Sequence, residues 1–102
     1  MLTGLLIMQA HQKLLISIDL ETHSQNPAKC AIGAIGMAAY AWEQGCVAEY
    51  IAWIDPKSAL QFGEADADTM TWWNAQPQAV RRQITDGKVQ IKDALAALAA
   101  KI

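Results

Sequence analysis

The chain has few cysteines and no excess of positive charge, and each shortage excludes a class of protein. Its two cysteines, Cys30 and Cys46, are too few for a disulfide framework or a four-ligand zinc site, and they look badly placed to pair. A reducing cytoplasm is therefore the expected compartment. The formal net charge of -2 argues against a protein that simply coats nucleic acid. It does not argue against an enzyme whose metal ions supply the positive charge.

The N-terminal segment also lacks a long apolar run. The apolar patch Leu5–Met8 is shorter than a signal-peptide core or a membrane span, and no Lys or Arg precedes it. We therefore expect residues 1–12 to be a disordered or leader segment, with Met8 as one candidate for the natural start, and we expect no membrane partner. The 102 residues, with 53% apolar and 18% charged residues, indicate one small globular domain.

Residues 13–22, which read KLLISIDLET, predict a strand that ends in two acids. Apolar residues alternate in a β-branched run, and the run closes with Asp19 and Glu21 separated by Leu20. Residues two apart on a strand point to the same side, so both carboxylates leave the sheet together. Two neighbouring like charges repel each other unless a cation lies between them, and Mg²⁺ or Mn²⁺ favours such oxygen ligands. The alternative is a strand that simply runs into a solvated loop.

The remaining pattern predicts an α/β fold. Two further strands are expected at residues 30–42 and 46–54, paired antiparallel across a turn at residues 43–45, which gives a three-stranded, mainly antiparallel sheet with the strand at residues 13–21. Helices are expected at residues 66–75, 77–85 and 89–102, from acidic caps, a proline start and apolar residues at helical spacing.

Two motifs together resemble the DnaQ-like (DEDD) 3′-5′ exonucleases, which have a ribonuclease H-like fold. The first is ISIDLET at residues 16–22, followed by the small-residue strand AIGAIG at residues 31–36. The second, Thr69-X-X-Trp72-Trp73-X-X-Gln76, resembles the phage and bacterial exonuclease branch in particular. On this resemblance, residues 13–102 are the N-terminal part of a ribonuclease H-like exonuclease domain.

The resemblance implies hydrolysis of a terminal phosphodiester with two metal ions, Mg²⁺ or Mn²⁺. By motif match, Asp19 and Glu21 would be the catalytic metal ligands, and Leu20 and Thr22 would touch the 3′ end of single-stranded DNA or RNA. The helix with Trp72 and Trp73 would lie beside the substrate cleft. We expect one of these tryptophans in the core and leave the place of the other open.

The chain also departs from the family pattern. Family members carry two further aspartates and, in this branch, a general-base histidine, on elements that would follow the last helix. Neither His11 nor His23 matches that base by position, and the remaining aspartates are expected to be ordinary solvated acids: Asp55, Asp66, Asp68, Asp86 and Asp93. Two carboxylates hold Mg²⁺ weakly, so we expect little or no nuclease activity from this chain alone.

The absence of those elements leaves two alternatives to an enzyme open. The chain could be a non-catalytic interaction module, or a truncated gene product that retains the first exonuclease motif. Because strands and helices of the full domain would be missing, self-association through an exposed sheet edge or helix face is expected as well.

Overall fold

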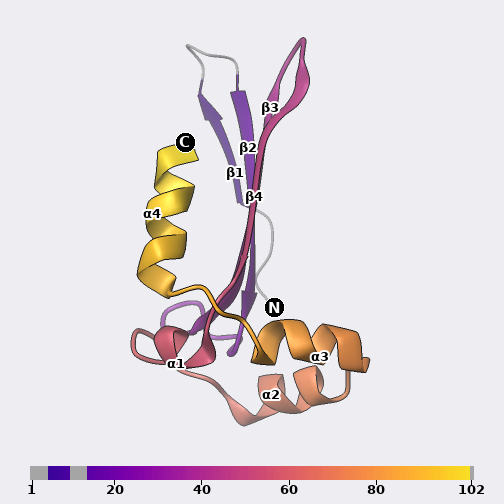
Figure 1. Cartoon of the computed structure of the whole chain (residues 1–102), viewed down its shortest axis with the longest axis vertical. Coiled ribbons are helices and arrows are strands. Elements are labelled where there is room, and N and C mark those ends of the chain that lie inside the picture. The colour runs from indigo at the N-terminus through magenta and orange to yellow at the C-terminus, as the bar shows by residue number, and fades with distance from the viewer. Residues whose placement is uncertain (1–4, 10–13, 102) are drawn as a thin grey trace.

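The structure, a computed structural model, describes residues 5–9 and 14–101. These residues form a four-stranded antiparallel sheet in the order β1-β2-β3-β4, followed by four helices (Figure 1). The strands are β1 (Leu5–Gln9), β2 (Leu14–Thr22), β3 (Ile32–Ala41) and β4 (Gly45–Trp53). The helices are α1 (Pro56–Ala59), α2 (Ala67–Asn74), α3 (Gln78–Thr85) and α4 (Ile91–Lys101). The chain is therefore an α/β protein.

The three predicted strands and the three predicted helices are confirmed as β2, β3, β4, α2, α3 and α4. Two elements were not predicted. Residues 5–9, which we expected to be disordered or part of a leader, form a strand, because Leu5–Gln9 pairs with Ile18–Leu14 as β1. Residues 1–4 and 10–12 lie outside the described residues. The short helix α1 begins where the Asp55 carboxylate accepts a hydrogen bond from the Lys57 backbone N–H at 3.1 Å.

The register of the three long strands separates the side chains of the sheet into two faces. Paired residues share a face, and the side alternates along each strand. One face carries three cross-strand rows, which are Ile16–Ala39–Ala48, Ile18–Met37–Tyr50 and Leu20–Ile35–Ala52. The opposite face carries Ser17–Ala38–Glu49, Asp19–Gly36–Ile51 and Glu21–Ala34–Trp53. We call the first the α4 face and the second the carboxylate face.

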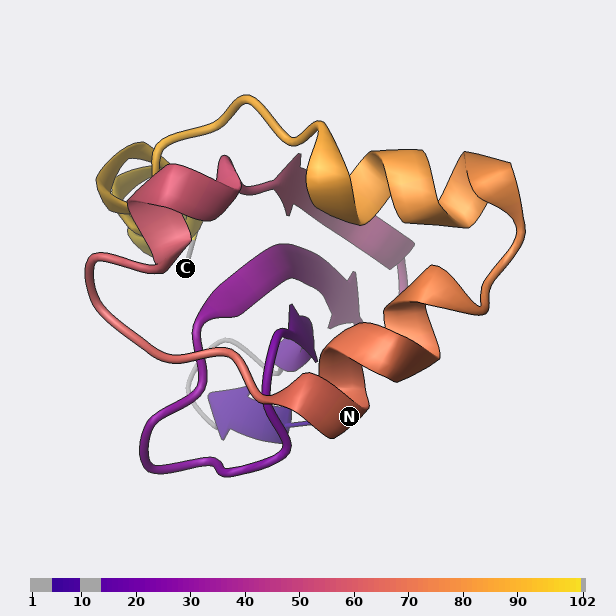
Figure 2. The same cartoon turned by 90° about the horizontal axis from the view of Figure 1, so that it is seen from below.

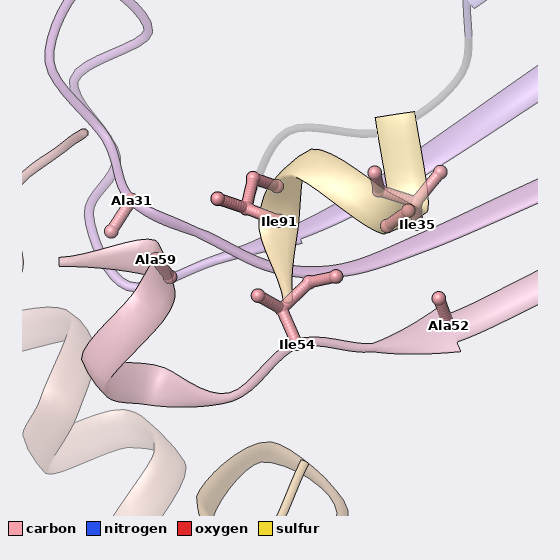
Figure 3. Packing of buried hydrophobic residues seen from close by; sticks show 7 residues of the cluster. Ala31, Ile35, Ala52, Ile54, Ala59 and Ile91 are labelled. Carbon is pink, nitrogen blue, oxygen red and sulfur yellow. The ribbon is translucent and has the colours of Figure 1, made fainter. Parts of the chain in front are cut away.

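Helix α4 covers the α4 face and supplies much of the core (Figure 1). Ile91 and Ala94 of α4 belong to one buried cluster with Ile35 and Ile54, both of which are fully buried. Figure 3 shows Ile91 above the strands, close to Ile35 and Ile54, with Ala31 and Ala59 completing the same cluster. Leu98 continues the contact along α4 toward Ile16 and Met37. Burial of these apolar side chains is the main source of stability in such a small domain.

Helices α1, α2 and α3 gather at the end of the sheet where β2 ends and β3 begins (Figure 2). The segment between α3 and α4 is held against the end of β4, because the Val89 N–H donates to the Trp53 carbonyl at 3.2 Å and the Asp55 N–H donates to the Val89 carbonyl at 2.8 Å. Gly87 permits this approach, since a Cβ there would lie 2.4 Å from the Ile54 carbonyl oxygen.

The structure also bears on the pairing of the cysteines and on whether a helix could span a membrane. Cys30 and Cys46 are both free. Over residues 5–9 and 14–101, none of the helices has the length and apolar character needed to cross a bilayer.

Candidate functional site

Asp19 and Glu21 lie on the carboxylate face near the end of β2. Their partners on β3 are Gly36 and Ala34, so the neighbouring side chains are small; Asp19 is exposed and Glu21 is half-buried. An open groove of about 520 Å³ lies over this face beside Asp19, and its walls include Tyr40, Glu49 and Ile51. The predicted geometry, with both carboxylates on one side of a strand, is therefore present in the structure.

Glu21 is half-buried, and one of its oxygens lacks a hydrogen-bond partner. Its Oε2 atom is buried, and no described residue donates a hydrogen bond to it. Burial raises the pKa of the Glu21 carboxyl, and the negative charge of Asp19 raises it further. A buried carboxylate oxygen without a donor is costly unless a cation or a proton neutralises it. This orphaned oxygen therefore fits a hard divalent cation, which takes carboxylate oxygens as ligands.

The number of such ligands in the described part of the chain is small. No group of three or more His, Cys, Asp or Glu side chains that could hold a metal ion occurs among residues 5–9 and 14–101. The fit to Mg²⁺ or Mn²⁺ therefore rests on the Asp19–Glu21 pair.

Thr22, predicted to touch the substrate, is engaged within the protein. Its side chain is fully buried, and its hydroxyl donates to the Ser24 carbonyl at 2.6 Å. Its own carbonyl accepts a hydrogen bond from the Trp73 indole N–H at 2.9 Å. Leu20 lies on the α4 face, where its side chain packs against the buried cluster around Ile35. The side chains of Leu20 and Thr22 thus support the end of β2 from within the protein.

The two tryptophans of α2 have different environments. Trp73 is 3% exposed and is the one in the core, whereas Trp72 is 45% exposed. Their rings form an edge-to-face pair with centroids 5.0 Å apart and planes at 81°. The exposed ring of Trp72 is thereby joined, through Trp73, to the residue that follows Glu21. The Trp73–Thr22 bond links residues 51 apart in the chain, and no pattern in the sequence indicates it.

Asp66 fixes the start of α2 against the loop after β2. Its carboxylate accepts hydrogen bonds from the backbone N–H groups of Thr69 at 2.7 Å and Gln25 at 3.0 Å. These two bonds lower the pKa of Asp66 to about 2. The Asp66 N–H in turn donates to the His23 carbonyl at 2.9 Å. Asp66 is therefore the N-cap of α2, in agreement with the acidic cap expected for a helix at residues 66–75.

His23 is almost completely buried just after β2. Burial lowers the pKa of its imidazole. Its Nε2 atom has no hydrogen-bond partner among the described residues and would lie 3.2 Å from a Cβ added at Gly33. His23 is therefore a buried imidazole packed against the start of β3.

Comparison with known proteins identifies the family. Searches of curated proteins and of solved structures gave no match. A family model described as the 3′-5′ exoribonuclease Rv2179c-like domain matches residues 15–102, which include both acids of β2 and the helices α1 to α4. The chain therefore belongs to the family of 3′-5′ exoribonuclease Rv2179c-like domains.

Proposed function

We propose that this protein is a metal-dependent 3′-5′ exonuclease that removes nucleotides from the 3′ end of a single strand. The observation that carries the proposal is the buried, unpartnered Oε2 atom of Glu21, two residues from Asp19 on the same face of β2. Membership of an exoribonuclease-like family supports the same reaction and favours RNA over DNA as the substrate. A hard cation between these two acids would remove both their mutual repulsion and the desolvation cost at Glu21.

The two acids, Asp19 and Glu21, would hold Mg²⁺ or Mn²⁺. When bound, such ions lower the pKa of a coordinated water and stabilise charge on the attacking and leaving oxygens. The protein would contribute the position of Asp19 and Glu21 and a surface for the strand. Trp72 offers an exposed ring on which the terminal base can stack, a contact that tolerates any base.

Two carboxylates alone form a weak site. Mg²⁺ requires near-octahedral coordination and gives up water reluctantly, so a pair of ligands leaves most positions to solvent. The residues described here supply no third ligand group beside them. Weak activity is therefore the expectation for these 102 residues, and Mn²⁺ is the better ion for detecting it.

The direct test is a single-turnover assay on 3′-labelled single-stranded RNA and DNA of the same sequence with Mn²⁺. Asp19→Ala and Glu21→Ala should each abolish the release of the 3′ nucleotide, and Glu49→Ala, which removes an acid of β4 from the same face of the sheet, should not. Metal-dependent release that survives both Asp19→Ala and Glu21→Ala would contradict the proposal.

A second candidate function, an interaction module, is favoured by the free edge of β4. The order of the sheet places β4 at its edge, and over residues 45–52 no described residue pairs with its outer side. Val47 and Ile51 are large apolar residues on this strand, exposed by 46% and 69%. An unpaired, exposed strand of this length is a template for another strand. The occupant that fits is a second copy of this chain, because antiparallel pairing of β4 with itself closes around a two-fold axis.

Sedimentation at increasing protein concentration tests this second function. A dimer that is lost in Glu49→Pro, where proline removes a backbone N–H on the outer side of β4, would support it. A monomer at all concentrations would contradict it. If the dimer forms equally well in Asp19→Ala, association and metal binding are separate properties.

A further inference from the structure

The hydrogen bond from Trp73 to Thr22 lies beside an irregularity in the pairing of β2 with β3. The pairing of β2 with β3 shifts register between Glu21 and Thr22, where Ala34 and Ile32 are the successive partners. A register shift leaves one residue unpaired and bends the strand locally. On the other side of β2, the described pairs with β1 run from Leu14 to Ile18. The residue that carries the orphaned carboxylate oxygen is thus the last one before the irregularity.

Trp73 of α2 holds this end of β2 through a hydrogen bond. Its indole N–H donates to the Thr22 carbonyl at 2.9 Å, and both groups are buried. The peptide that joins Thr22 to His23 is thereby held in one orientation, and the Thr22 hydroxyl secures the same turn through the Ser24 carbonyl. The helix itself is anchored nearby, because the Asp66 N–H donates to the His23 carbonyl.

From these contacts we infer that Trp73 is a positioning residue, whose indole N–H holds the end of β2 so that the Glu21 carboxylate stays on the same side as Asp19. This inference rests on the proposed function, because the purpose of the alignment is cation binding by the two acids. Trp73 is buried and would not touch the substrate, which distinguishes its role from that of the exposed Trp72. Trp73 is thus the tryptophan that lies in the core, where one of the two was expected.

The expected loss of metal affinity can be taken from other groups that orient a metal ligand. Removal of a group that orients a metal ligand typically lowers metal affinity by about 10–100-fold. Trp73→Phe keeps an aromatic ring in the core and removes only the indole donor and part of the ring area. We therefore expect Trp73→Phe to lower the affinity for Mn²⁺ by about tenfold. Trp72→Phe, a matched change on the neighbouring exposed ring, should leave it unchanged.

The experiment measures Mn²⁺ affinity by electron paramagnetic resonance for the unaltered chain, Trp73→Phe, Trp72→Phe and Asp19→Ala. In parallel, ¹⁵N relaxation reports the backbone order of Glu21 and Thr22. A merely structural role would lower the unfolding temperature without loosening these two amides in the folded state. Should Trp73→Phe not fold, benzothienylalanine at position 73 keeps the ring shape and replaces the N–H with sulfur.

The expected result is that Trp73→Phe binds Mn²⁺ more weakly and has a more mobile Glu21 backbone. Trp72→Phe should show neither change. Unchanged affinity in Trp73→Phe, with binding that Asp19→Ala abolishes, would overturn the positioning role and leave the proposed function intact. Absence of Mn²⁺ binding by the unaltered chain would contradict the proposed function, and this inference would fall with it.

Discussion

The two faces of the sheet differ in how far their apolar side chains are buried and in whether their buried polar atoms have hydrogen-bond partners. On the α4 face, Ile16, Ile35 and Met37 are almost entirely removed from water and pack against α4. On the carboxylate face, Ile51 is 69% exposed and the Oε2 atom of Glu21 is buried without a donor. The first face is optimised for folding. The second accepts an energetic cost at Glu21, which is the usual sign of a site that binds something.

The largest expected effect is on the free energy of unfolding, when an isoleucine on each face is replaced by alanine. Ile35→Ala should lower the free energy of unfolding by about 2–5 kcal/mol, because it leaves a cavity under α4. Ile51→Ala, which removes the same atoms from the opposite face, should change it by less than about 0.5 kcal/mol. Urea denaturation of both variants measures the difference. Equal losses would show that the carboxylate face is packed as tightly as the α4 face.

A smaller effect of opposite sign is expected at the acid pair. Glu21→Gln removes the buried charge, so without metal it should raise the unfolding temperature, whereas Glu49→Gln should not. The pKa of Glu21 is raised above its usual 4.5, so the folded state holds this proton to higher pH than the unfolded chain. Stability should therefore fall as pH rises from about 4.5 through the raised pKa, and Glu21→Gln should remove this part of the decline. A lower unfolding temperature for Glu21→Gln would mean that the carboxylate is stabilised by the protein itself.

The smallest effect concerns the cap that joins α2 to the end of β2. The pKa of Asp66 is lowered from 3.8 to about 2, so its charged form is favoured in the folded state. Its contribution is complete above about pH 4 and disappears as pH falls toward 2. Asp66→Asn keeps a capping side chain without the charge. Its stability deficit against the unaltered chain should shrink between about pH 5 and pH 2, and a constant deficit would contradict the assignment.

The sequence predicts the elements well because the physical signals are local. Alternation in residues 14–22, the turn before Gly45 and the capping acid at Asp66 each indicate their structure within a few residues. The strand β1 escapes such reasoning, since residues 5–9 become a strand only through pairing with β2. The same limit applies to the site. Asp19 and Glu21 are evident from their spacing, whereas the bond from Trp73 to Thr22 depends on how α2 packs against the sheet.

The central claim is that the carboxylate face binds a divalent cation through Asp19 and Glu21. Thermal unfolding with and without Mn²⁺ tests it most directly, since a ligand that binds only the folded state raises the unfolding temperature in proportion to RT ln(1 + [L]/Kd). The account predicts that Mn²⁺ raises the unfolding temperature of the unaltered chain and of Glu49→Gln, and leaves Asp19→Asn and Glu21→Gln unchanged. The same rise in all four proteins, or in none, would contradict it.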